Sequence, residues 1–240
     1  MKFGALLLAA GSGSRMKGEV VDKLLHPIGN TNAFSLCLAA FIQSAEIKEL
    51  MITYRNEEQL ASFQQCVKNI LAQYNPSPRP KIEWVLGGKE RQDSVLSGLL
   101  ALEDSITHVL VHDCARPLIR QTTISELCRE VARDRAVSVA RPLKNSLRLR
   151  LDQTNEPLNP AITKTIDRSN HWLMETPQGA PREWLINGLR KSIESHTPVT
   201  DDMGAIELLG YPVGFLEPDY PNPKITTPDD LPYIHFLQTS

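Results

Sequence analysis

Residues 3–16 read FGALLLAAGSGSRM, a continuous apolar run that passes directly into a glycine-rich segment. An apolar run of this length, bounded by glycines, is typical of a strand buried on both faces of a parallel sheet. Gly11 and Gly13 have no Cβ and can adopt positive φ, so the backbone N–H groups around them are open to a phosphate. Arg15 and Lys23 add fixed positive charge nearby. The stretch therefore predicts a nucleotide triphosphate site at the carboxyl end of the first strand.

The loop lacks the two best-known glycine signatures. The dinucleotide fingerprint requires a third glycine or alanine where Met16 stands, and the Gly-Lys-Ser/Thr of an ATP-binding P-loop is absent. A Gly-x-Gly pair alone is equally consistent with an ordinary connection between a strand and the next element. The loop needs support from other parts of the chain.

Composition narrows the class of protein. The 240 residues carry 26 Lys plus Arg against 28 Asp plus Glu, a net charge of −2 that argues against general nucleic-acid binding. No apolar stretch is long enough to span a bilayer, and Met1-Lys2 leads straight into the first strand, so we expect neither a membrane anchor nor a signal peptide. The cysteines show no C-x-x-C or zinc spacing, which indicates reduced thiols in the cytoplasm. They are Cys37, Cys66, Cys114 and Cys128.

Strand and helix patterns alternate along the first half of the chain. Strands are expected at 3–10, 49–54, 81–86 and 107–112. Helices are expected from 33 to about 44 after a cap at Asn32, after a cap at Asn56, and up to about residue 102. This rhythm predicts a single α/β domain with a mostly parallel sheet and helices on both faces. Later helices are expected to start at Pro181, at Thr200-Asp201-Asp202 with a stop at Gly210, and at Thr227-Pro228.

Three expected strand ends collect polar or glycine-rich residues, namely 11–15, 87–94 and 113–117. Ligands of such sheets bind outside the carboxyl ends of the strands, so this coincidence is stronger than any one loop. Asp113 could bind Mg²⁺ or a ribose hydroxyl, or could form a turn. Arg116 could contact substrate or hold its own loop, and Ser94 could contact the ligand or cap a helix.

The chain then leaves the α/β rhythm. After an expected strand at 136–140, residues 146–151 alternate strictly between apolar and polar, and 161–166 could return as the partner strand. A protruding hairpin is marginal alone, and a second subunit is its natural cover. We therefore predict that 142–165 is a dimerisation arm and that the chain re-enters the body at 165–168.

Seven segments occur in a recognisable order and spacing: AAGSGSRM (9–16), GGKERQDSV (87–95), VHDCARP (111–117), TIDR (165–168), TPQ (176–178), VTDD (199–202) and KITTPDDL (224–231). The chain resembles the 2-C-methyl-D-erythritol 4-phosphate cytidylyltransferases of the non-mevalonate isoprenoid pathway. The resemblance implies a Rossmann-like nucleotidyltransferase that joins CTP to a sugar-alcohol phosphate, releases pyrophosphate and uses Mg²⁺. It also implies a homodimer whose arm helps to build the partner's substrate site.

The resemblance also implies roles for individual residues. Arg15 and Lys23 resemble the catalytic cations that neutralise charge growing on the α-phosphate and the pyrophosphate. The residues expected at the nucleotide are Ala9, Ala10, Gly11, Gly13, Gly88, Ser94, Asp113 and Cys114. Those expected at the sugar phosphate are Asp113, Arg116, Thr200, Lys224 and, from the other subunit, Arg168, while Asp113 is also the expected metal ligand.

The sequence departs from the family pattern at several positions. Asp22 precedes Lys23 where the family usually has proline, and a carboxylate there could draw the lysine away or weaken its field. Lys89 stands where an acidic residue is common, Cys114 replaces a common alanine, and Asn145-Ser146 replaces a common Asp-Thr. Two alternatives therefore stay open: a ribitol 5-phosphate cytidylyltransferase, and a catalytically silent relative that binds CTP.

Overall fold

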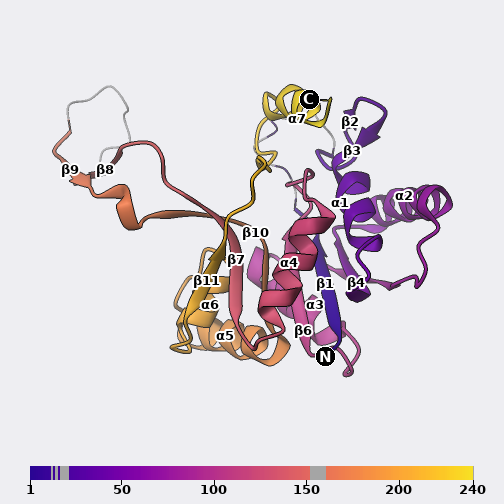
Figure 1. The fold of residues 1–240 in the computed structure, drawn as a ribbon, viewed down its shortest axis with the longest axis horizontal. Helices are drawn as coiled ribbons and strands as arrows, with labels where there is room; N and C mark the ends of the chain where they lie inside the picture. The colour runs from indigo at the N-terminus through magenta and orange to yellow at the C-terminus, as the bar shows by residue number, and fades with distance from the viewer. Residues whose placement is uncertain (12, 14–15, 17–21, 152–160, 240) are drawn as a thin grey trace.

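A computed structural model of the chain describes residues 1–11, 13, 16, 22–151 and 161–239. Within these residues, seven strands form one sheet in the order β11-β7-β10-β6-β1-β4-β5 (Figure 1). Every neighbouring pair is parallel except the two made by β10, which runs antiparallel to β6 and β7. The strands are β1 (Phe3–Leu8), β4 (Ile47–Tyr54), β5 (Lys81–Leu86), β6 (His108–Asp113), β7 (Ala136–Pro142), β10 (Trp172–Pro181) and β11 (Val213–Leu216). The predicted α/β class and mostly parallel sheet are confirmed.

Strand β1 lies inside the sheet between β6 and β4, and its side chains enter two separate cores. Ala5, Leu6 and Leu7 are fully buried, as the apolar run predicted. Ala5 and Leu7 belong to one hydrophobic cluster and Leu6 to the other, because successive side chains of a strand point to opposite faces. The strand is therefore buried on both sides.

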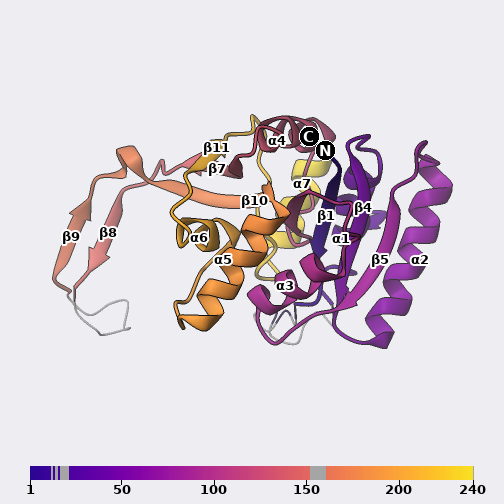
Figure 2. The same cartoon turned by 90° about the horizontal axis from the view of Figure 1, so that it is seen from below.

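Helices cover both faces of the sheet (Figures 1 and 2). On one face, α1 (Ala33–Ile42), α2 (Glu57–Tyr74) and α4 (Gln121–Val131) contribute to the first cluster. On the other, α3 (Arg91–Ala101), α5 (Arg182–Glu194) and α6 (Asp202–Glu207) contribute to the second. The last helix, α7 (Asp230–Thr239), lies beside the small hairpin of β2 (Pro27–Ile28) and β3 (Thr31–Asn32).

The predicted helix caps mostly hold. The side chain of Asn32 accepts a hydrogen bond from the Ser35 backbone N–H at 2.8 Å, and that of Asn56 accepts one from Gln59 at 2.9 Å. Asp201 caps α6 in the same way. The predicted starts of two helices lie too early in the sequence. Pro181 is the N-cap of α5 rather than its first residue, and the Thr227-Pro228 segment is a turn that precedes α7.

Among the strands of the main sheet and the helices that cover it, α4, β10 and β11 were not predicted from the sequence. Strand β10 contains Pro177, Gly179 and Pro181, and such residues are depleted from central strands. Its pairing with β7 is irregular between Met174 and Gln178, which is where the prolyl residue is accommodated. The strand therefore carried the wrong composition for its central position.

The predicted hairpin projects away from the body (Figure 1). Strands β8 (Leu147–Arg150) and β9 (Thr163–Ile166) pair antiparallel, and the turn between them at 152–160 lies outside the described residues. The backbone N–H of Leu143 donates to the carbonyl of His171 at 2.8 Å and joins the two ends of the projection. The segment between β7 and β10, called the arm below, runs from 143 to 171 and extends beyond the predicted 142–165, and the chain rejoins the sheet at Trp172, after the predicted 165–168.

Helices α5 and α6 pack through one glycine. A Cβ added at Gly188 would lie 2.4 Å from the backbone oxygen of Ala205 in α6. Gly188→Ala should therefore lower the free energy of unfolding by roughly 1–2 kcal/mol, since overpacking against main chain outweighs the gain in helix propensity. Urea denaturation measures the change.

Gly214→Ala is the matched control, because the nearest atom to its added Cβ is 3.6 Å away. Its stability should stay within about 0.5 kcal/mol of wild type. Equal stability of Gly188→Ala and wild type would mean that α5 and α6 separate without cost.

Candidate functional site

A cleft of about 460 Å³ opens at the carboxyl ends of the parallel strands. Three of the loops that line it follow β1, β5 and β6, where the sequence predicted a ligand site. The lining residues are Leu8, Ala10, Gly11, Gly13, Lys23, Leu24, Thr53, Arg55, Gly88, Lys89, Glu90, Arg91, Ser94, Asp113, Ala115, Lys224 and Thr226. Five of the lining side chains are cationic, so the cleft suits a polyanion. They are Lys23, Arg55, Lys89, Arg91 and Lys224.

The start of the glycine loop is anchored to the neighbouring strand. The Thr53 hydroxyl of β4 accepts hydrogen bonds from the backbone N–H groups of Ala9 at 2.8 Å and Ala10 at 3.2 Å. Gly13 has a φ of 64°, the left-handed conformation that glycine permits. Ala10, Gly11 and Gly13 line the cleft as predicted, whereas Ala9 is buried and does not. Arg15 lies outside the described residues.

The loop after β5 is held by its own side chains. The Ser94 hydroxyl accepts from the Gly88 backbone N–H at 2.9 Å and donates to the Glu90 carbonyl at 3.2 Å. A Cβ at Gly88 would lie 2.3 Å from that of Asp93, so only glycine fits this turn. Ser94 therefore organises the loop, while both residues also line the cleft. Their contact with a nucleotide stays a prediction.

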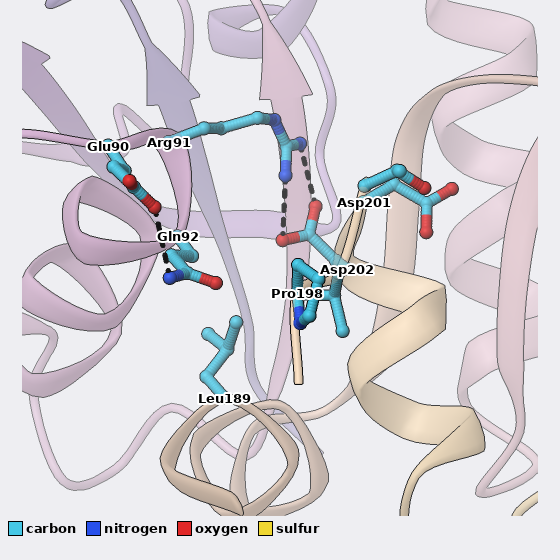
Figure 3. A pocket seen from close by; sticks show the side chains of 9 residues that line it. Glu90, Arg91, Gln92, Leu189, Pro198, Asp201 and Asp202 are labelled. Carbon is cyan, nitrogen blue, oxygen red and sulfur yellow. Dashed lines mark hydrogen bonds and ion pairs between the residues drawn. The ribbon is translucent and has the colours of Figure 1, made fainter. Parts of the chain in front are cut away.

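Asp113 lies at the end of β6, opposite Leu8 at the end of β1. Its carboxylate accepts from Arg91 Nε at 3.2 Å and from Lys224 Nζ at 2.6 Å. The same arginine donates two hydrogen bonds to Asp202 at the start of α6, at 3.0 and 2.8 Å (Figure 3). Arg91 thus joins two buried carboxylates, and a bidentate pair of this kind fixes the guanidinium plane.

The environment sets the protonation of this cluster. Burial alone would raise the pKa of Asp113, but the charges of Arg91 and Lys224 outweigh it and hold the pKa well below the usual range. Burial raises the pKa of Asp202 more than Arg91 lowers it. Burial also lowers the pKa of His112 to about 4, so this imidazole is neutral at pH 7. Asp113 is therefore an anion beside a neutral histidine.

A smaller hollow of about 120 Å³ adjoins the cleft (Figure 3). Glu90 and Arg91 line both spaces, and Thr200 lines only the smaller one. The predicted sugar-phosphate residues are therefore divided: Lys224 and Asp113 face the cleft, and Thr200 faces the adjoining hollow. Arg91 lies between them.

The carboxylate beside Lys23 does not pair with it. Asp22 accepts from Arg55 Nη2 at 3.1 Å and from Gln59 Nε2 at 2.5 Å. Lys23 instead extends its ammonium to the Ile225 carbonyl at 2.9 Å, and it lines the cleft. The expectation that Asp22 could draw the lysine away is not supported.

The geometry does not support two predicted contacts, Arg116 and Cys114, whereas the contact predicted for Arg168 concerns the other subunit and stays a prediction. Arg116 donates to the carbonyls of Asn222 and Met174 and does not line the cleft, so it holds its loop, which was the second of its two predicted roles. The Cys114 side chain is fully buried in the hydrophobic core and cannot face a ligand. Arg168 donates to the Lys144 carbonyl within the arm and is absent from this chain's own cleft lining.

The sequence model of the 2-C-methyl-D-erythritol 4-phosphate cytidylyltransferases matches residues 3–240. The chain belongs to this cytidylyltransferase family. The enzyme of that name from Caldanaerobacter subterraneus is 32% identical over 231 residues, which is 96% of each chain. The one from Klebsiella pneumoniae is 34% identical over 98% of this chain and 93% of its own.

Solved structures agree with the fold. A 4-diphosphocytidyl-2C-methyl-D-erythritol synthase from Anaerococcus prevotii superposes with a TM-score of 0.81 at 24% identity, over 100% of this chain and 96% of that one. The 2-C-methyl-D-erythritol 4-phosphate cytidylyltransferase from Thermus thermophilus gives 0.74 at 24% identity, with both chains fully covered. In the part of the chain that the structure describes, no helix is long and apolar enough to cross a bilayer.

The cleft of this cytidylyltransferase-family chain offers a metal ion few ligands of its own. Among the described residues, no three or more His, Cys, Asp or Glu side chains are grouped to hold one. Both oxygens of Asp113 are already acceptors for Arg91 and Lys224. The donor set does not fit a cation held by the protein alone. Asp113 as metal ligand stays a prediction that this arrangement does not favour.

Sequence reasoning missed Arg91, Asp202 and Arg55. Arg91 lay inside the 87–95 motif but was not singled out, and Arg55 comes directly after β4. The rule that ligands bind at the carboxyl ends of parallel strands would have found Arg55. No local signal in the sequence pairs Arg91 with Asp202, which is 111 residues away.

Arg91 is the counter-charge of both buried carboxylates, so Arg91→Met should cost about 3–5 kcal/mol of stability at pH 7. Without the guanidinium, the folded-state pKa of Asp202, which burial already raises, lies further above that of the unfolded chain, while Asp113 keeps Lys224 as its counter-charge. The folded variant then binds more protons than the unfolded one, so its stability should increase as the pH falls from 7 toward 5. Thermal denaturation across this range measures the loss.

Arg133→Met is the control, because Arg133 forms an exposed ion pair with Glu130. It should change stability by less than about 1 kcal/mol. A loss in Arg91→Met that is independent of pH would contradict the assigned role.

Proposed function

We propose that this chain transfers the cytidylyl group of CTP to 2-C-methyl-D-erythritol 4-phosphate, giving 4-diphosphocytidyl-2-C-methyl-D-erythritol and pyrophosphate. The observation that supports this most directly is the cleft itself. It combines the glycine loop with the side chains of Lys23, Arg91 and Lys224, of which Arg91 and Lys224 contact the Asp113 carboxylate. A triphosphate and a sugar phosphate both require such positive charge, and the family membership supports the choice of substrates.

The reaction needs positioning rather than acid–base chemistry. An oxygen of the sugar phosphate attacks the α-phosphorus of CTP and forms the new P–O bond. The bond from the α-phosphorus to the oxygen bridging to the β-phosphate breaks, and its electrons leave with pyrophosphate. A phosphate nucleophile is already ionised at neutral pH, so no general base is required. The neutral, buried His112 is consistent with this.

Within this proposal, the described cations stabilise charge that grows during transfer. Lys23 lines the cleft within reach of the glycine loop and would neutralise the α-phosphate and the departing pyrophosphate. Arg15 is proposed to join it. Lys224 and Asp113 would contact the sugar phosphate, with Thr200 at the far side of Arg91. Mg²⁺ is proposed to arrive with the CTP phosphates and to balance their charge, since the described residues alone offer it no site.

The arm is proposed to dock on a second copy of the chain. Four apolar side chains along it are exposed, which an isolated hairpin would not tolerate well. They are Leu147, Leu149, Leu151 and Ile162. A homodimer would cover them and bring Arg168 of each arm to the partner's sugar-phosphate site.

The four cysteines are all unpaired in the structure, which supports a reducing compartment such as the cytoplasm.

The proposed activity predicts pyrophosphate release when the protein is mixed with CTP, Mg²⁺ and 2-C-methyl-D-erythritol 4-phosphate. A coupled phosphate assay measures it, with omission of the sugar phosphate as the blank. Release with ribitol 5-phosphate alone would replace the substrate but keep the chemistry. Binding of CTP without release in either mixture would favour the catalytically silent relative.

A shared site predicts complementation between subunits. Lys23→Ala should lower kcat by roughly 10²-fold, the scale of removing one electrostatic stabiliser. Arg168→Ala should mainly raise the KM for the sugar phosphate. Mixed after denaturation and refolding, the two variants should regain about a quarter of wild-type activity at low sugar phosphate, since half of the dimers form one intact site.

The control is each variant refolded alone and then mixed without exchange. No recovery in the exchanged mixture would mean that Lys23 and Arg168 act in the same chain's site. A variant Lys23→Ala with near-normal kcat would remove this lysine from the mechanism.

A further inference from the structure

Asp22 is one of the departures of this chain from its family pattern, and its carboxylate is almost fully enclosed. The side chain is 9% exposed. One oxygen accepts from the Leu24 backbone N–H at 2.9 Å. The other accepts from Arg55 at 3.1 Å and from Gln59 at 2.5 Å. Three donors on one carboxylate, one of them a guanidinium, make a strong and directional anchor.

The two side chains that hold Asp22 also hold Ala9 and Gly11, where the glycine loop starts. Arg55 Nη1 donates to the carbonyl of Gly11 at 3.0 Å, and Gln59 Nε2 donates to that of Ala9 at 3.3 Å. Gln59 Oε1 in turn accepts from the Arg55 backbone N–H at 2.8 Å. Both residues stand on rigid supports, because Arg55 directly follows β4 and Gln59 lies in the first turn of α2.

Lys23 is held both through its backbone and through its side chain. The Asp22 carbonyl accepts from the backbone N–H groups of Leu25 at 3.2 Å and His26 at 2.9 Å, so the backbone around Lys23 is a closed turn. The Lys23 ammonium reaches across to the Ile225 carbonyl. Because Arg55 neutralises the Asp22 carboxylate, that carboxylate attracts Lys23 less than an unpaired anion would.

We propose that Asp22, Arg55 and Gln59, here called the clasp, form a positioning device that fixes Lys23 relative to Ala9 and Gly11 at the start of the glycine loop. The proposal rests on the proposed function, in which Lys23 faces the α-phosphate. Misplacement of a catalytic group by about 1 Å can cost up to 10²-fold in rate, so an anchor beside Lys23 acts on kcat. Asp22 and Gln59 do not line the cleft, so the clasp acts through Lys23 and the start of the loop.

Kinetics of Asp22→Asn test the clasp, since this change removes the charge and keeps the size. We expect kcat to fall roughly 10-fold, with little change in the KM for the sugar phosphate. In the Lys23→Ala background, the same substitution should lower kcat by less than about 2-fold, because its effect passes through Lys23. Equal effects in both backgrounds would overturn the proposal and reduce Asp22 to a structural role.

Two further variants sharpen this test. Arg55→Lys keeps the charge but cannot serve Gly11 and Asp22 together, so it should lower kcat by a smaller factor than Asp22→Asn. Glu58→Gln is the matched control, because Glu58 is an exposed carboxylate in the first turn of the same helix. Its kcat should equal that of wild type. An Arg55→Lys enzyme with wild-type kcat would contradict the clasp.

Hydrogen exchange tests the clasp without any turnover. The Leu24 amide is bonded to Asp22 Oδ1, so Asp22→Ala should speed its exchange at least about 10-fold while amides of α3 keep their rates. Unchanged exchange at Leu24 would overturn the clasp whatever the activity. Failure of the pyrophosphate assay together with faster exchange would instead overturn the proposed function and leave the clasp in place.

Discussion

The site depends on the pairing of the Arg91 guanidinium with two carboxylates, those of Asp113 and Asp202. Asp113 at the end of β6 and Asp202 at the start of α6 are both buried, and burial of an unpaired carboxylate is strongly unfavourable. Arg91 contacts both, because its planar fork satisfies Asp202 with two donors and still reaches Asp113 with a third, where Lys224 supplies a second cation. The pairing also ties α3 to α6, and it thereby fixes the wall between the cleft and the adjoining hollow.

The opposite end of α3 is held by a second arginine. Arg182 is buried at the start of α5 and donates to the carbonyls of Leu99, Leu102 and Glu103. Leu99 and Leu102 lie at the end of α3, where carbonyls have no partner within the helix, and a cation there also suits the helix dipole. Helix α3 is therefore anchored at both ends, which keeps Ser94 and the loop of Gly88 in a constant position beside the cleft.

Local sequence patterns were sufficient for the parallel half of the fold. The apolar run of β1, the caps Asn32 and Asn56, and polar residues after strands all report local preferences, and they placed the cleft correctly. Patterns failed where a residue's partner is distant in sequence. The two roles considered for Arg116 could be separated only once the fold brings the carbonyls of Asn222 and Met174 to it. Strand β10 was not predicted because its prolines and glycine obscure a central strand.

Strand β10 connects the arm to the site as one continuous element. It leaves the arm at Trp172 and passes between β6 and β7, and the hydroxyl of Thr176 accepts a hydrogen bond from the backbone N–H of Asp113. An extended strand resists stretching, so β10 couples the position of the arm to the position of the site. A displacement of the arm is therefore passed along β10 to the backbone of Asp113, whose carboxylate faces the cleft. A change in how the arm is docked would therefore change the geometry of the site.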